Sequence, residues 1–158
     1  MTAVPDIEFR AVTKRYGASG APLVVKGIDL VVPKGTLTTL LGPSGCGKTT
    51  TLRMIAGLDA PTGGQILIDG RDVTTLGPAE RNVSMVFQSY ALFPHMSVIQ
   101  NVSYGLVVSG VAKDEAARRA RAAMESVGLS GYDQRAPSEL SGGQQQRVAV
   151  ARSPALGP

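Results

Sequence analysis

The stretch GPSGCGKT, Gly42–Thr49, lies between the strand-like sequence TLTTLLG (36–42) and the helix-like sequence KTTTLRMIAGL (48–58). Its three glycines allow backbone conformations in which successive N–H groups point into one concavity. A helix that begins near Lys48 adds the partial positive charge of its N-terminus, which favours an anion. The stretch fits the pattern G-x-x-x-x-G-K-[ST] together with the strand and helix that this pattern requires. It therefore predicts a loop that binds the phosphates of a nucleotide.

Two side chains at the end of this loop have an expected chemical role. Lys48 offers an ammonium to the β- and γ-phosphates, and Thr49 offers a hydroxyl to Mg²⁺, a hard cation that prefers oxygen ligands. The alternative is a glycine-rich turn that contains a lysine for structural reasons. The match at every motif position and at both flanks favours the nucleotide site.

Composition and charge predict a globular protein. The chain has 158 residues, of which 43% are hydrophobic and 18% charged, and its net charge is +4. This length suits one domain with a real core. Basic residues gather in KDEAARRARAAME (113–125), where Asp114 and Glu115 each precede an arginine by four residues, which favours ion pairs on a solvated helix face. The segment lacks the aromatic partners of a nucleic-acid patch, so we expect no nucleic acid as a partner.

Two further features concern the compartment. Cys46 is the single cysteine, which excludes an internal disulfide and is consistent with a reducing compartment. The start, MTAVPDIEFR, lacks the pattern of a signal peptide, and VSYGLVVSGVA (102–112) is too short and too polar to span a bilayer. We expect a cytoplasmic protein that serves a membrane, if at all, from outside the lipid.

Periodicity divides the expected elements into two groups. Strands are expected at 7–12, 28–33, 36–42, 63–70 and 82–88. From Val98 onward the segments 98–106, 113–125 and 143–152 have helical spacing or composition. The first part of the chain is thus expected to mix strands and helix, and the second part to be helical.

Other motifs add a family resemblance. LSGGQ (140–144), 92 residues after Lys48, resembles the signature of ATP-binding cassette (ABC) ATPases, and VFQSYALFPHMSVIQNVSYGL (86–106) resembles their Q-loop region. Tyr16–Gly17 is similar to the aromatic A-loop of the family. The likeness runs from Ile7 to Arg152 and is strongest to bacterial importer subunits for polyamines, ferric iron or phosphonates.

The resemblance implies an α/β fold, a P-loop NTPase of ABC type. It would have an N-terminal antiparallel β part, an incomplete RecA-like parallel sheet and a helical signature subdomain. The implied division is 1–88 for the β-rich and P-loop part, 89–145 for the helical subdomain, and 146–158 for the start of the return to the core.

The resemblance also implies residue roles. Tyr16 would stack on adenine, Gln88 would coordinate Mg²⁺ or the attacking water, and the signature would contact the γ-phosphate bound by a second copy. Thr49 and Gln88 are the expected metal ligands. His95 precedes the signature and does not match the family's switch histidine, so it receives no role. The expected ATP-binding residues are Tyr16, Gly42, Pro43, Ser44, Gly45, Cys46, Gly47, Lys48, Thr49, Thr50, Gln88, Ser141, Gly142, Gly143 and Gln144.

The function implied by the resemblance is the ATP-binding subunit of an ABC importer, with ATP and Mg²⁺ as cofactors. Its partners would be a second ATPase subunit in a head-to-tail dimer, the transmembrane permease subunits and, indirectly, a solute-binding protein. The expected location is the inner face of the cell membrane. Two alternatives remain: a regulatory module that binds nucleotide without hydrolysing it, and an ABC ATPase without a transport role.

The sequence after Arg152 departs from the family pattern. The Walker B aspartate, the glutamate general base and the switch histidine have no counterpart in the 158 residues, so we expect a truncated ATPase with no catalytic residue of its own. Such a chain is expected to be unstable alone and to hydrolyse ATP negligibly. Pro154 is expected to end the last helix near Arg152, because proline inside a helix costs about 3 kcal/mol.

Overall fold

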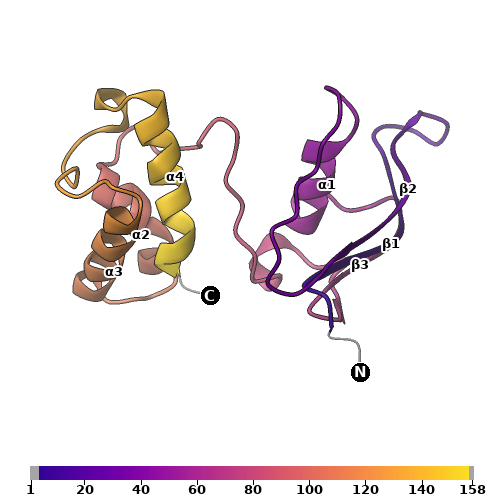
Figure 1. Cartoon of the computed structure of the whole chain (residues 1–158), viewed down its shortest axis with the longest axis horizontal. Helices are drawn as coiled ribbons and strands as arrows, with labels where there is room; N and C mark the ends of the chain where they lie inside the picture. Colours follow the sequence, from indigo (N-terminus) through magenta and orange to yellow (C-terminus); the bar gives the residue numbers. More distant parts are fainter. Residues whose placement is uncertain (1–3, 157–158) are drawn as a thin grey trace. The chain divides into compact units, whose positions relative to one another are not determined.

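The computed structural model describes residues 4–156 of the chain. The chain divides into two compact units, Met1–Val83 and Ser84–Pro158. Each unit is described separately below; Figure 1 draws both.

The first unit contains a four-stranded antiparallel sheet. Its strands are β1 (Ile7–Arg15), β2 (Leu23–Val32), β3 (Gly63–Ile68) and β4 (Arg71–Asp72), in the order β2-β1-β3-β4. Phe9 lies opposite Leu30 on one side and opposite Ile66 on the other. The strands expected at 7–12, 28–33 and 63–70 are confirmed in position, although β1 and β2 are each longer than expected.

Helix α1 (Lys48–Ile55) packs on this sheet. Its Met54 is fully buried in a cluster with Phe9, Val12, Val25, Ile66 and Val73. The α1 helix therefore forms where the sequence predicts one, directly after the glycine-rich loop. Burial of Met54 among sheet residues fixes the helix, because so short a helix is marginal without tertiary packing.

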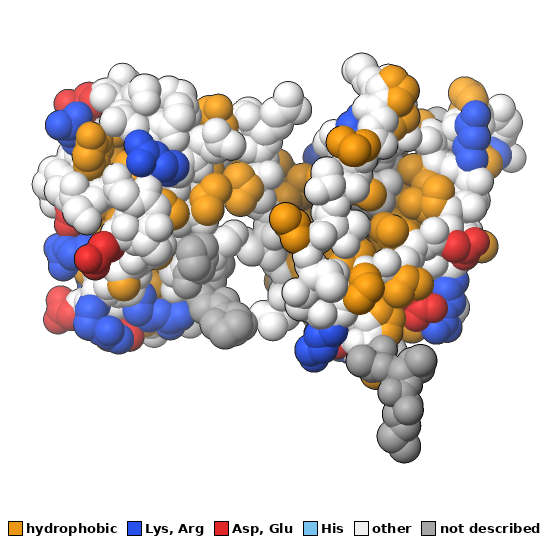
Figure 2. Space-filling model, viewed as in Figure 1, with side chains coloured by type: hydrophobic (Ala, Val, Ile, Leu, Met, Phe, Trp, Pro, Cys, Tyr) orange, Lys and Arg blue, Asp and Glu red, His pale blue; other side chains and the backbone are white. Residues whose placement is uncertain are grey.

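Two expected strands are wrong. Residues 36–42 and 82–88 have no strand structure, and neither segment pairs with a strand among residues 4–156. A strand needs a hydrogen-bonded neighbour, whatever its β propensity. The side chains of Leu37 and Leu41 are 97% and 89% exposed as a result. Figure 2 shows hydrophobic side chains, in orange, on the surface of this unit.

The second unit is helical. Its helices are α2 (Val98–Val108), α3 (Lys113–Ser126) and α4 (Gly142–Leu156), and each of them packs against the other two. Small and aliphatic side chains form the core, among them Val102, Leu106, Ala120, Met124 and Val148. Ser97 caps α2: its hydroxyl accepts from Gln100 N, and Gln100 Oε1 accepts from Ser97 N.

The expected end of the last helix near Arg152 is also wrong, because α4 continues through Pro154 to Leu156. Ala151 and Ala155 are both buried in the helical core, so packing on either side of the proline favours the extra turn.

The expected i,i+4 ion pairs of α3 need a correction too. Glu115 binds Arg118, three residues on, at 2.6 Å.

In the part of the chain that the structure describes, no helix combines the length and the apolar character that crossing a membrane would require.

Candidate nucleotide-binding site

The glycine-rich loop runs into α1 with a conformation that its glycines permit. Gly45 and Gly47 have φ of 80° and 97°. A Cβ on Gly47 would lie 3.1 Å from the carbonyl oxygen of Val24 and 3.3 Å from Val25 Cγ2. The loop thus passes close to β2, and a larger residue at Gly47 would force its neighbours to shift. Within the described residues no side chain caps α1 at Gly47, so the first-turn N–H groups have no side-chain acceptor there.

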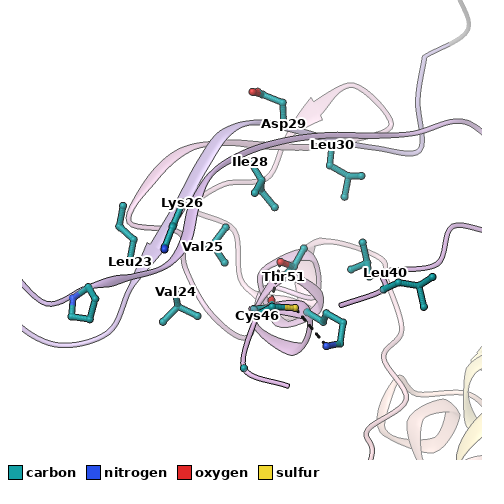
Figure 3. Close-up of a pocket in the computed structure, with 15 residues that line it drawn as sticks. Leu23, Val24, Val25, Lys26, Ile28, Asp29, Leu30, Leu40, Cys46 and Thr51 are labelled. Carbon is teal, nitrogen blue, oxygen red and sulfur yellow. Dashed lines mark hydrogen bonds between the residues drawn. The ribbon is translucent and has the colours of Figure 1, made fainter. Parts of the chain in front are cut away.

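The Lys48 ammonium is bound by its own loop. Lys48 Nζ donates to the carbonyl oxygens of Gly42 at 2.7 Å and Pro43 at 2.8 Å, and it lies 3.5 Å from Cys46 Sγ. Figure 3 shows the last contact as a dashed line. The loop therefore brings together a cation and the free end of a helix, the two features that a polyphosphate binds.

A hollow of about 760 Å³ lies between the same loop and strand β2. Ile28 and Leu30 point into it from β2, Leu40 faces it from the other side, and Asp29 points away (Figure 3). Its lining is mainly aliphatic, which suits apolar contacts rather than phosphates. Gly45, Gly47 and Lys48 of the glycine-rich loop border this hollow.

Tyr16 is linked to the helix that follows the loop. Tyr16 Oη donates to Asp59 Oδ2 at 2.6 Å, and Arg53 Nε of α1 donates to the same oxygen at 2.9 Å. The Arg53 guanidinium, and then the Tyr16 hydroxyl, hold the pKa of the Asp59 carboxyl below its usual value. The Asp59 carboxylate, with some help from burial, raises the pKa of the Tyr16 phenol. Tyr16, 48% exposed, is thus linked through Asp59 to Arg53 in the last turn of α1.

Arg81 fixes the other end of α1. It is 4% exposed, and its Nη1 donates to the carbonyl oxygens of Met54 at 2.5 Å and Ile55 at 3.2 Å. Its Nε donates to Leu76 O at 2.9 Å. Burial lowers the pKa of this guanidinium. Its place at the C-terminal end of α1 is one that suits a cation. Gly57 leaves room for it, because a Cβ there would lie 2.7 Å from Arg81 Nε.

Gln88 lies in the second unit, in an exposed turn. Tyr90 N donates to Phe87 O at 2.9 Å, and Tyr90 and Ala91 have positive φ of 62° and 48°. Arg152 holds the turn by donating to Ala91 O at 2.8 Å. Gln88 and Thr49 thus belong to different units, each with its own core.

The signature residues begin α4. Ser141 Oγ accepts from Gln144 N at 3.3 Å, and Gln144 Oε1 accepts from Ser141 N at 2.9 Å. Gln144 Nε2 also contacts the Tyr132 hydroxyl at 3.2 Å. Gly142 and Gly143 are exposed, and apart from their chain neighbours and the backbone of α4 no described atom lies within 4 Å of a Cβ placed on either. This helix start is open to a large ligand.

Thr49 fits the part of a magnesium ligand. It is exposed in the first turn of α1, directly after Lys48. Mg²⁺ is usually held by one or two protein oxygens together with phosphates and water, so a single hydroxyl beside a phosphate site suits it.

The model of the ABC transporter family matches residues 25–158. The chain belongs to this family. Similar proteins include the Fe(3+) ions import ATP-binding protein FbpC 1 of Rhizobium meliloti (strain 1021), 58% identical over all of this chain and 44% of that protein. FbpC of Agrobacterium fabrum (strain C58 / ATCC 33970) is 59% identical over 97% of this chain and 42% of its own length. The chain therefore spans less than half of these relatives.

Solved structures of ABC proteins share the fold. The dimeric post-hydrolysis state of the ATP-binding cassette MJ0796, bound to ADP and Pi, has a TM-score of 0.86 and 32% identity. The match covers 96% of this chain and 70% of that one. A second dimeric structure of MJ0796 has a TM-score of 0.85 and a sequence identity of 34%. The resemblance to ABC ATPases that the signature and Q-loop motifs indicate is thereby confirmed, and with it the α/β P-loop fold of ABC type.

Sequence reasoning missed Asp59 and Arg81. Asp59 lies in a loop and Arg81 after a short 3₁₀ turn, η1 (Pro78–Glu80), and neither belongs to a spaced motif. Their partners, Tyr16 and Met54, are 43 and 27 residues away along the chain. The sequence AGL (56–58), directly after α1, indicates a helix end at Gly57, but not the side chain that packs against this glycine.

Proposed function

We propose that the chain is the ATP-binding part of an ABC importer, which couples ATP binding and hydrolysis to solute uptake. The observation that carries this proposal is the phosphate loop at the start of α1, with Lys48 inside it, in a chain that also has LSGGQ at the start of α4. The relatives named as Fe(3+) import proteins support the importer class. Their names make ferric ion the first solute to test.

In this proposal the loop's N–H groups and Lys48 hold the phosphates, and Tyr16 stacks on adenine. Lys48 exchanges its bonds to Gly42 and Pro43 for bonds to phosphate oxygens. The hydroxyl of Thr49 and the amide oxygen of Gln88 would hold Mg²⁺, which neutralises phosphate charge. Ser141, Gly142 and Gly143 of a second copy would contact the γ-phosphate through the open start of α4.

The proposed partners follow from this arrangement. A second copy completes each nucleotide site, and the dimeric MJ0796 structures support a dimer. Transmembrane permease subunits would receive the conformational change, with a solute-binding protein acting on their far side. We place the chain on the cytoplasmic, inner face of the membrane.

The first experiment titrates the 158-residue chain with MgATP and compares it with Lys48→Ala. Loss of the ammonium is expected to weaken binding at least about tenfold, since charge-assisted bonds to phosphate are among the stronger contacts. Lys113→Ala, an exposed lysine at the start of α3, is the matched control and is expected to bind like the parent chain. Equal affinities for all three would contradict the phosphate-loop assignment. Co-purification with a ferric-ion permease then tests the importer class.

A further inference from the structure

The ring of Tyr16 is held by more contacts than an exposed loop residue needs. Its hydroxyl is bound to Asp59, and Lys14 Nζ lies 4.8 Å from the ring centroid. Lys14 is itself fixed, because its ammonium donates to Ala60 O at 2.6 Å. The ring is therefore oriented through its hydroxyl and on a face at once. Tyr16 lies one residue beyond the end of β1, and Gly17 follows it with φ of 93°.

The segment that carries Asp59 is anchored on both sides. On the helix side, Asp59 N donates to Arg53 O at 3.3 Å, and the Arg53 guanidinium binds the carboxylate. On the sheet side, Thr62 N donates to Thr13 O at 2.8 Å and Thr62 Oγ1 accepts from Arg15 N at 2.9 Å. The carboxylate is mostly buried, with 14% of the side chain exposed. Asp59 thus has a fixed position relative to α1.

We propose that Asp59 is a positioning residue for base recognition: its carboxylate holds the Tyr16 ring in place relative to the helix that carries the phosphate loop. The inference rests on the proposed function, in which this ring stacks on the base. Stacking of a base on an aromatic ring contributes about 1–3 kcal/mol when the two planes are aligned. A ring that is already oriented loses less freedom on binding, so its anchor contributes to affinity without touching the ligand.

The test compares two ligands of the 158-residue chain, MgATP and magnesium tripolyphosphate. Both offer phosphates to the loop, but only ATP offers a base. Asp59→Ala is expected to weaken ATP binding about five- to tenfold, a fraction of the full stacking contribution, and to leave tripolyphosphate binding within about twofold. A loss for ATP alone is a result that damage to α1 or to the loop would not give.

Three further variants sharpen the comparison. Tyr16→Phe keeps the ring and removes its anchor, so it is expected to match Asp59→Ala, and the double variant is expected to lose no more than either single one. Asp59→Asn keeps an acceptor oxygen and is expected to retain most of the ATP affinity. Asp133→Ala, which removes the partner of Arg121 in the other unit, is the control and is expected to bind both ligands like the parent chain.

Each contrary result has a distinct meaning. An equal loss for ATP and tripolyphosphate in Asp59→Ala and Tyr16→Phe would overturn the inference, because Asp59 would then support only the helix. Unchanged ATP binding in both variants would overturn it too. If the parent chain bound both ligands equally, the base would not be recognised and the inference would fail while the phosphate loop stood. If the parent chain, folded by circular dichroism, bound neither ligand, the proposed function itself would fail.

Discussion

Arg81 donates a hydrogen bond to the carbonyl oxygen of Met54 at 2.5 Å, from a side chain that lies 27 residues further along the chain. Met54 is in the last turn of α1, the helix whose first residue is Lys48. One buried guanidinium thus satisfies carbonyls that the end of a helix would otherwise leave without partners. The same side chain reaches Leu76, so it ties the helix to the segment that follows the sheet.

Replacing Arg81 by alanine is expected to destabilise the first unit. The change removes the bonds to Met54, Ile55 and Leu76 and leaves buried carbonyls unpaired, which we expect to lower the free energy of unfolding by about 2–4 kcal/mol. Urea unfolding followed by circular dichroism measures it. Arg118→Ala, at a side chain that is 72% exposed, is the control and is expected to stay within about 0.5 kcal/mol. Equal stability of the two variants would contradict this reading of Arg81.

Alanine at Gly57 is expected to be worse than alanine at Gly110. Both glycines have positive φ, 74° and 84°, so both substitutions strain the backbone by about 1–2 kcal/mol. Only at Gly57 would the new Cβ also meet Arg81 Nε at 2.7 Å and Pro78 N at 3.0 Å; no described atom lies within 4 Å at Gly110. The difference in melting temperature between the two variants measures the crowding. If both lost the same stability, Arg81 and Pro78 would not be held in these positions.

Acid is expected to remove the contribution of Asp59 to stability. Its carboxyl pKa is lowered in the folded chain by Arg53 first and by Tyr16 second, with Lys14 adding a smaller effect. The contribution is therefore complete above the unfolded pKa, about 3.9, and is lost as pH falls through the lower folded pKa. Because asparagine does not titrate, the difference in unfolding free energy between the parent chain and Asp59→Asn should shrink from pH 7 toward pH 3. A constant difference over that range would rule the ion pair out as its source.

Base is expected to act on the other partner of this contact. The pKa of the Tyr16 phenol is raised in the folded chain, so its contribution is present below the unfolded pKa of about 10 and is lost as pH rises through the folded value. Absorbance of tyrosinate near 295 nm, compared between the parent chain and Tyr16→Phe, reports this titration. The absorbance that the parent chain shows and Tyr16→Phe lacks belongs to the Tyr16 phenol, and we expect it to rise only above the usual pH range of a tyrosine. A rise centred at or below about pH 10 would contradict the bond to Asp59.

Asn101 is expected to be the most sensitive polar position of the second unit. It is fully buried, its Oδ1 accepts from Phe93 N, and its Nδ2 donates to the carbonyls of Phe93, Met96 and Ser97. Asn101→Ala should cost about 2–4 kcal/mol, because these backbone groups lose their partner. Ser103→Ala removes only a 3.5 Å contact and is the control. Faster amide hydrogen exchange at 93–97 in Asn101→Ala would locate the effect; unchanged exchange there would contradict it.

Local patterns predicted the parts of this fold that depend on local physics. The glycine-rich loop, α1, the starts of β1 and β3 and the helices from Val98 onward follow from φ preferences, capping and periodicity within a few residues. Residues 36–42 show the limit: their β-branched and leucine-rich composition suits a strand, but strand formation depends on a neighbour that composition does not reveal. Pro154 shows a second limit of local prediction, because the burial of Ala151 and Ala155 outweighs the free-energy cost of a proline inside the helix.

The candidate site divides in the same way. The loop residues and the signature follow from spaced motifs, whereas the residues that hold them in place do not. Asp59 and Arg81 act through contacts that span 43 and 27 residues of sequence, with main-chain carbonyls or a single hydroxyl as partners. Such partners leave no pattern in the sequence, since almost any residue supplies a carbonyl.

Lys48 Nζ donates hydrogen bonds to two carbonyl oxygens of its own loop, those of Gly42 and Pro43. Any polyphosphate that arrives must compete with two carbonyls for one ammonium. The affinity of the loop for a polyphosphate is then the difference between the contacts that Lys48 gains with phosphate and those that it gives up within the loop. A variant that weakens the contacts within the loop would bind anions more tightly without any new bond to them.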